Sequence, residues 1–234
     1  MKRRLLLPVV LLASLALGAP LSAQEAIPHQ ASPLVIKDTF SFVPGTWADY
    51  AIFDKTKNEA SRMYISILKR DTISGKSGIW MEIEAEMKDS PLIVTDVFVE
   101  ETKAGPGEIY KAVIQVKGMS PFTIPKKFLE GQDQQVGNFE AAQIVKRMEQ
   151  KKIVHNGRTI DVWIVEALDK EGRKVAATVS LQVLPITVVS AETDDMRMTL
   201  NDWGVGAQTR IEGEPIGFTL WIMEQIANGL SKKK

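Results

Sequence analysis

Residues 79–87 read IWMEIEAEM, and this stretch decides the fold class. Apolar side chains occupy every second position, and the glutamates Glu82, Glu84 and Glu86 stand between them. Successive side chains of a β-strand point to opposite faces of the sheet, so this period of two predicts a strand with one apolar and one polar face. An amphipathic helix would not place three glutamates two residues apart.

The same alternation recurs on both sides of this strand. It predicts further strands over 47–54, 62–69, 92–101 and 108–117. Short stretches rich in Gly, Pro, Ser and Asp separate these strands, as is typical of tight turns. The spacing therefore predicts an antiparallel meander.

A second series of strands is expected in the C-terminal half. Asn156 and Gly157 mark a tight hairpin turn, because both central residues of a type I′ turn need a positive φ. The apolar pattern around and after this turn predicts strands over 150–155, 159–167, 174–184, 187–191 and 196–200.

Two segments of the middle region are less regular. Residues 139–150 fit helical spacing as well as a strand, and both readings stay open. Residues 118–137 lack periodicity over a length that is unusual in a compact domain, which favours a covering or functional loop. Within it, Pro125 is a suitable start for a short helix that ends at Leu129.

The C-terminal segment predicts a helix. Apolar residues recur at intervals of three and four after Pro215, and Gly229 stands where a helix would stop, so we expect a helix over 216–229. We expect it to cover an open side of the sheet, because Trp221 and its neighbours are apolar. The predicted fold is mainly β: a strongly curved antiparallel sheet or half-open β-barrel, with this helix and one or two short helices, in a single domain over 38–234.

The N-terminus predicts export. Residues 1–23 combine three basic residues at positions 2–4, an apolar run and small residues before Gln24, which is the pattern of a signal peptide cleaved near Ala23. The run is too short and too interrupted by prolines for a span of ~20 residues. We therefore expect a periplasmic or secreted chain that is soluble after cleavage, without a transmembrane segment. Residues 24–37 are predicted to be a flexible arm.

Charge and residue counts exclude several classes of function. The chain has 29 basic and 29 acidic residues, but without residues 1–23 its net charge is −3. Nucleic-acid binding depends on clustered Lys and Arg, so no nucleic acid is expected as a partner. There is no cysteine and there are only two histidines, His29 and His155, which disfavours a zinc site and a catalytic triad. No metal and no cofactor is predicted.

The three glutamates of 79–87 are the strongest candidates for catalysis. Alternate residues on one strand face lie about 6.5–7 Å apart, a separation that glycosidases also use between their carboxyl groups. A solvated outer face of the sheet explains the same pattern, and we prefer that interpretation. A hydrolase that uses Glu82 with Glu84 or Glu86 is the least favoured hypothesis, and the chain is predicted not to be an enzyme.

Short motifs suggest a family. Gly45 and Trp47 form a Gly-x-Trp pair, Gly78, Trp80 and Glu82 form Gly-x-Trp-x-Glu, and residues 200–204 read LNDWG. With these motifs, residues 38–212 resemble the lipoprotein-localisation (Lol-type) half-barrel superfamily of bacterial envelope proteins and its uncharacterised periplasmic relatives. The resemblance implies an antiparallel sheet that curls around an apolar cavity closed by helices, and the carriage of acyl chains across the periplasm.

The leading prediction for function is therefore a non-catalytic exported protein that holds a hydrophobic or amphiphilic ligand, such as a lipid or a lipoprotein acyl chain, in a concave sheet. Methionine adapts to irregular apolar ligands, and several methionines fall in predicted strands. The predicted lining is Met63, Ile65, Met81, Ile83, Ile114, Val179 and Leu181. The alternative is a structural or protein-interaction component of the bacterial envelope, with a solid core and a protein partner.

Overall fold

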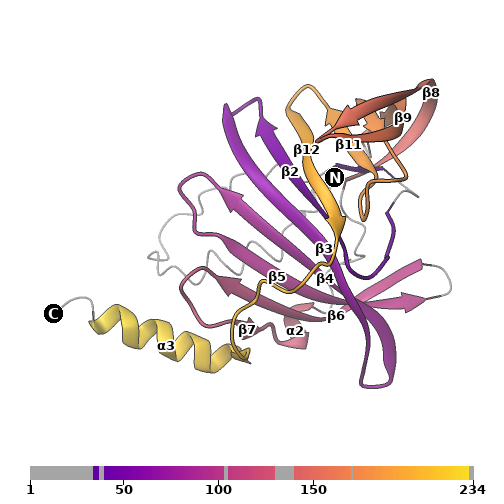
Figure 1. Cartoon of the computed structure of the whole chain (residues 1–234). Coiled ribbons are helices and arrows are strands. Elements are labelled where there is room, and N and C mark those ends of the chain that lie inside the picture. Colours follow the sequence, from indigo (N-terminus) through magenta and orange to yellow (C-terminus); the bar gives the residue numbers. More distant parts are fainter. Residues whose placement is uncertain (1–33, 37–39, 103–104, 130–139, 170, 232–234) are drawn as a thin grey trace.

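The fold is that of a computed structural model, which describes residues 34–36, 40–102, 105–129, 140–169 and 171–231 (Figure 1). The predicted leader and most of the predicted arm lie outside these residues. The described part is mainly β, as predicted. Its elements are β1 (Leu34–Ile36), β2 (Thr46–Asp54), β3 (Glu59–Ile73), β4 (Lys76–Met87), β5 (Ile93–Thr102), β6 (Gly105–Val116), β7 (Phe122–Thr123), α2 (Lys126–Leu129), β8 (Glu140–His155), β9 (Arg158–Leu168), β10 (Lys174–Val179), β11 (Val188–Glu192), β12 (Met196–Val205), β13 (Ile216–Gly217) and α3 (Phe218–Ser231).

The described strands form one sheet that does not close on itself. Their order is β1-β8-β9-β10-β11-β12-β2-β3-β4-β5-β6-β7-β13. The pairings are antiparallel except for the outermost pair at each edge, β1 with β8 and β7 with β13. The meander β2–β6 is the one that the sequence predicts, and β12 continues it by pairing with β2. The curved antiparallel architecture is therefore confirmed as an open sheet with two edges.

Three segments differ from the expected boundaries. The ambiguous residues 139–150 belong mostly to β8, because β8 pairs along its length with β9. Residues 34–36, which fall at the end of the predicted flexible arm, form β1 beside β8. β10 ends at Val179 rather than at 184, because the chain turns where Val183 N donates to Ser180 O.

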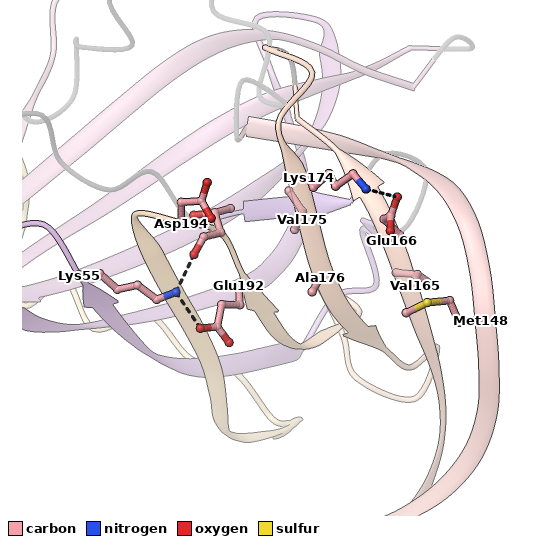
Figure 2. A pocket seen from close by; sticks show the side chains of 10 residues that line it. Lys55, Met148, Val165, Glu166, Lys174, Val175, Ala176, Glu192 and Asp194 are labelled. Atoms are coloured by element: carbon pink, nitrogen blue, oxygen red, sulfur yellow. Dashed lines mark hydrogen bonds and ion pairs between the residues drawn. The ribbon is translucent and has the colours of Figure 1, made fainter.

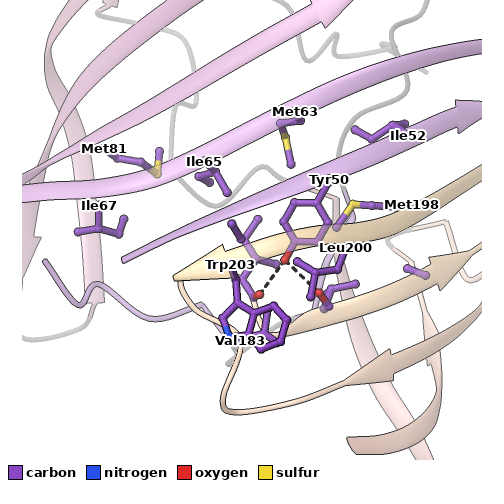
Figure 3. Close-up of a cluster of buried hydrophobic side chains, with 14 of the residues drawn as sticks. Tyr50, Ile52, Met63, Ile65, Ile67, Met81, Val183, Met198, Leu200 and Trp203 are labelled. Atoms are coloured by element: carbon purple, nitrogen blue, oxygen red, sulfur yellow. Dashed lines mark hydrogen bonds between the residues drawn. The ribbon is translucent and has the colours of Figure 1, made fainter. Parts of the chain in front are cut away.

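The two faces of the sheet differ in character. On the inner face, apolar side chains of β2–β6 and β12 meet in one buried cluster (Figure 3). Tyr50 lies within this cluster, and its hydroxyl is 2.9 Å from Ile186 O and 3.0 Å from Val188 O. Complete burial raises the pKa of Tyr50 well above its ordinary value. Tyr50 thus ties the meander to the segment between β10 and β11.

A segment that we call the strap, residues 206–215, crosses the outer face. It leaves β12, where Ala207 N donates to Gly45 O, and reaches β13, where Ile216 N donates to Pro121 O (Figure 1). Because β12 and β13 lie on opposite sides of the meander, the strap has to pass over the strands between them. It covers the outer face of the meander.

The C-terminal helix α3 is present, with bounds two residues later than predicted. Its first turns pack on the sheet edge through Trp221, whose ring centroid is 4.3 Å from that of Phe122. The rest of the helix projects away from the sheet (Figure 1). The expectation that it would cover an open side of the sheet is wrong, because the apolar residues Leu220, Met223 and Ile226 stay exposed.

Candidate functional site

The structure places most of the predicted lining on the inner face. Met63, Ile65, Met81, Ile114 and Val179 are buried members of the core cluster, and Ile83 is half-buried against it. Leu181 lies apart from them: its side chain is 68% exposed in the turn beyond the end of β10. The strand that should have carried Leu181 inward ends two residues earlier.

Strand register explains why the lining residues meet. Ile65 of β3 pairs with Ile83 of β4, Ile83 pairs with Thr95 of β5, and Thr95 pairs with Ile114 of β6. The next row joins Ile67, Met81, Val97 and Ala112 in the same order. Side chains in one register row share a face of the sheet, so the meander presents two adjoining rows that are apolar except for Thr95.

β12 extends this apolar surface with residues that the sequence prediction left out. Met198 pairs with Ile52, and Leu200 pairs with Tyr50. Met196, Met198 and Leu200 are all buried, and Figure 3 shows Met198 and Leu200 beside Tyr50. Their alternation was visible in the sequence, but their neighbours depend on the pairing of β12 with β2 across more than a hundred residues.

A pocket of about 340 Å³ lies elsewhere, at the ends of β9, β10 and β11 (Figure 2). Its lining includes charged side chains that pair with one another: Lys55 Nζ is 2.7 Å from Glu192 Oε1, and Lys174 Nζ is 3.7 Å from Glu166 Oε1. Lys55 also donates to Thr193 O. Four charged side chains of the pocket therefore already have partners within the chain, and Met148, Val165, Val175 and Ala176 supply apolar lining.

The outer face of β4 carries a buried acid cluster where a solvated face was expected. Glu82 is fully buried and Glu84 is 7% exposed, whereas Glu86 is exposed. The preferred interpretation of this glutamate ladder is thus wrong for two of its three residues. The reason is the strap, which passes over Glu82 and Glu84.

The strap holds both buried glutamates by direct contacts. Thr209 Oγ1 donates to Glu82 Oε2 at 2.9 Å, and Arg210 N donates to the same oxygen at 2.6 Å. Arg210 Nη1 donates to Glu84 Oε1 at 2.6 Å. The Arg210 guanidinium also stacks 3.6 Å above the centre of the Tyr64 ring. Burial therefore comes with compensation, because each carboxylate accepts at least one hydrogen bond.

Glu82 has a second acidic neighbour that the sequence prediction missed. Asp96 of β5 pairs directly with Glu82 in the sheet. Burial and the adjacent Glu82 raise the pKa of Asp96 to about 8. Ionising both of two carboxyl groups this close together costs free energy, because their negative charges repel. Asp96 therefore keeps its proton at neutral pH. The sequence signal for a buried Asp96 was its position among the apolar residues of 92–101. The residues two positions before and after it point outward as it does.

This acid cluster binds the strap to the sheet. Among the described residues, Arg210 engages Glu84, and Thr209 and the strap backbone engage Glu82, so two of the three glutamates in the least favoured hydrolase hypothesis are held by the strap. The structure instead brings Glu82 together with Asp96. Within the described part of the chain, no group of three or more His, Asp or Glu residues is placed to hold a metal ion.

The motif residues divide between the two faces, because Leu200 and Trp203 of LNDWG belong to the inner cluster whereas Trp47 and Trp80 lie on the outer face. Trp47 stacks on Tyr64 with ring centroids 5.6 Å apart, and Tyr64 in turn lies beneath Arg210. Gly204 lies under Trp47, where a Cβ would be 3.0 Å from the indole ring, closer than ordinary van der Waals contact. Trp80 Nε1 donates to Asp71 Oδ2, and its ring packs against Phe98. Trp47 and Trp80 of these motifs therefore shape the outer face of the meander.

His155 lies at the hairpin turn that the sequence predicts. Its Nε2 is 3.2 Å from Asn201 O, and its ring centroid is 5.5 Å from that of Trp203. Asn156 and Gly157 both have positive φ, as the turn requires. His155 thus joins the β8–β9 hairpin to β12.

Comparison with known proteins finds only distant similarity. No family model matches the chain, and no curated protein matches it. A structure of a protein from Parabacteroides distasonis, provisionally described as a lipoprotein, is similar at 10% identity and a TM-score of 0.35, over 73% of this chain and 99% of that one. A beta-barrel-like protein of the domain of unknown function DUF1849 from Brucella abortus is similar at 12% identity and a TM-score of 0.32, over 72% of this chain and all of that one.

Proposed function

We propose that the protein binds a hydrophobic or amphiphilic ligand, of the class of a lipid or a lipoprotein acyl chain, on the inner face of its sheet. The observation that carries this proposal is the pair of adjoining apolar register rows across β3–β6, extended by β12. A ligand that removes apolar area of such a surface from water gains about 25 cal/mol per Å² of apolar area buried. No covalent chemistry is needed for binding or release.

Two further features support this proposal. The sheet is open, so its two edges are not joined by hydrogen bonds and can separate without breaking a closed ladder. Four methionines, Met63, Met81, Met196 and Met198, lie on the inner face. The flexible thioether side chain fits ligands of varied shape. The inner-face side chains are covered in the structure, so binding requires a second conformation, in which they are uncovered, to be populated.

The resemblance of the motifs to the Lol-type superfamily agrees with this ligand class. In this proposal the mature chain works outside the cytoplasm, after removal of residues 1–23, and residues 38–234 act as one domain. Met63, Ile65, Met81, Ile83 and Ile114 line the binding surface together with Val179. Leu181 is left out of the proposed lining because of its exposure.

Native mass spectrometry of protein purified without detergent tests the proposal. We expect additional masses that disappear after extraction with organic solvent, and binding of an added fatty acid to the extracted protein. Met81→Gln should weaken fatty-acid binding, because it places an amide on the inner face. The matched control is Met148→Gln, since Met148 is exposed on β8. A protein that carries no lipid and binds no added fatty acid would refute the proposal.

The alternative of a protein-interaction component of the envelope is favoured by a different observation. Val145, Met148 and Val154 of β8 are exposed apolar residues on the strand next to the edge. Exposed apolar patches mark interaction surfaces. A photo-crosslinking residue at position 148 in living cells should trap a protein if this alternative is correct, and should give no protein adduct if it is not.

A further inference from the structure

The C-terminal helix carries an apolar surface that no other described part of the protein covers. Leu220, Ile222, Met223 and Ile226 are 52%, 38%, 60% and 59% exposed. At about 100° per residue these four side chains occupy one continuous arc of the helix. Trp221 lies on the other side, where it is buried against Phe122. The helix is therefore anchored by one side and presents its other apolar side outward.

Aromatic contacts fix the orientation of this arc. Phe218 packs against Phe122 at 5.8 Å and against Phe128 of α2 at 5.8 Å, measured between ring centroids. Phe128 is itself 37% exposed, so it extends the apolar surface beyond the start of α3. We call Phe128, Leu220, Ile222, Met223 and Ile226 the α3 patch. Because the first turn of α3 is packed against the sheet edge and α2, the α3 patch is already formed before a partner binds.

Lysines precede Phe128 and follow α3 in the sequence. Lys126 and Lys127 precede Phe128, and the Lys127 Nζ lies 5.1 Å from the centre of the Phe128 ring. Lys232, Lys233 and Lys234 follow the helix in the sequence. Between residues 218 and 234 there is a single acidic residue, Glu224, which the helical period places off the exposed arc. An apolar helix surface with Lys127 beside it and three further lysines after it in the sequence is complementary to a surface of fatty chains beneath negative headgroups.

The dimensions of α3 distinguish lying on a membrane from crossing it. Its 14 residues span ~21 Å, which is shorter than the ~30 Å hydrocarbon core. Among the described residues, no helix has both the length and the apolar character that a membrane span requires. An amphipathic helix of this kind lies in the interface with its apolar arc among the acyl chains.

We propose that the α3 patch docks the protein on the surface of an anionic lipid bilayer. The helix lies parallel to the membrane, Leu220, Met223 and Ile226 enter the acyl boundary, and the flanking lysines contact negative headgroups. This surface is separate from the inner face, and the proposal holds whether or not the inner face binds a ligand. It gives the protein a membrane contact that can be made and broken, because no segment of α3 is inserted across the bilayer.

Vesicle flotation tests this proposal on protein recovered after export, with its N-terminus checked by intact mass. The probes are vesicles of phosphatidylcholine with and without phosphatidylglycerol. We expect binding to the anionic vesicles, and loss of that binding in 1 M salt, where the Debye length falls to about 3 Å. Binding that is equally strong to neutral vesicles, or absent from both, would overturn the proposal.

Matched variants locate the contact. Met223→Glu with Ile226→Glu should weaken binding at least about tenfold, because each side chain contributes apolar burial. Gln225→Glu with Asn228→Glu adds the same two negative charges on the other side of the helix and should leave binding unchanged. Both positions of the first double variant are exposed, so folding should be retained, and circular dichroism checks this. If the first double variant binds as the parent does, the α3 patch is not the docking surface.

A single label reports where the helix goes. The chain contains no cysteine, so Met223→Cys provides a unique site for an environment-sensitive dye. We expect its emission to shift to the blue when anionic vesicles are added. A dye that stays in water while the protein floats would contradict the proposal. A shift without vesicles that grows with protein concentration would also contradict it, since the occupant would then be a second copy of the chain.

Discussion

The two faces of the β2–β6 meander bury their side chains by opposite means. The inner face buries apolar residues such as Ile65 and Met81 against one another, and their contribution is non-directional. The outer face buries Glu82 and Glu84, which is tolerated only because Thr209 and Arg210 of the strap supply donors. The inner face is therefore stabilised by apolar burial without directional partners, whereas the outer face depends on specific donors from the strap.

The largest expected effect comes from the inner face. Ile65→Ala should lower the free energy of unfolding by about 2–5 kcal/mol, because Ile65 is fully buried and the substitution leaves a cavity. Ile83→Ala is the matched control in the same register row, and it should cost less because Ile83 is half-buried. Urea denaturation measures both values. Equal costs at the two positions would show that Ile65 is not better packed than Ile83.

A smaller loss is expected on the outer face. Glu84→Gln should lower the free energy of unfolding by roughly 1–2 kcal/mol, a value reduced for the partial exposure of Arg210, because the charge-assisted bond to Arg210 is lost. Glu86→Gln lies on the same strand and face but is exposed, so its effect should be close to zero. Thermal unfolding of both variants makes the comparison. If Glu86→Gln costs as much as Glu84→Gln, the strap does not distinguish the two glutamates.

The acid pair predicts a pH dependence with a definite sign. The folded pKa of Asp96 is about 8, above the ordinary value of ~3.9 for an unfolded chain. The contribution of protonated Asp96 to the stability of the folded state is therefore fully present below about pH 4 and is lost progressively as the pH rises through about 8. Asp96→Asn cannot lose a proton, so we expect the variant to be more stable than the parent at pH 8 and similar to it near pH 4.

Melting temperatures between pH 4 and pH 8 measure this dependence. For a domain of this size, each kcal/mol shifts the melting temperature by about 2–4 °C. Glu86→Gln again serves as the control, because it removes an exposed carboxyl group from the same face. A difference between Asp96→Asn and the parent that does not change with pH would mean that the pKa of Asp96 is not raised in the folded protein.

The two faces also differ in how far the sequence predicts their burial. The inner face was predictable from local alternation, since Met81 and its neighbours in 79–87 needed no knowledge of the rest of the chain. The burial of Glu82 and Glu84 was not predictable, because it depends on a strap more than 120 residues away whose own sequence has no periodicity. The pairing of Glu82 with Asp96 likewise depends on the register of β4 with β5.

The errors at the ends of elements have local causes. Leu181 continued the apolar alternation of 174–184, but the turn from Ser180 to Val183 ends β10 and leaves Leu181 exposed. α3 begins two residues later than predicted and covers no face of the sheet, because among the side chains described in α3 only Phe218 and Trp221 have aromatic partners at the edge. A helix with apolar residues on most sides does not reveal in its sequence which side will be packed.

Photo-crosslinking with a diazirine-bearing fatty acid tests most directly whether the inner face is the binding surface. After illumination, digestion and mass spectrometry, we predict adducts on peptides of β3, β4 and β6, at or near Met63, Met81 and Ile114, with competition by unlabelled fatty acid. Adducts that fall only on exposed residues such as Met148 of β8, or that unlabelled fatty acid does not displace, would contradict the account.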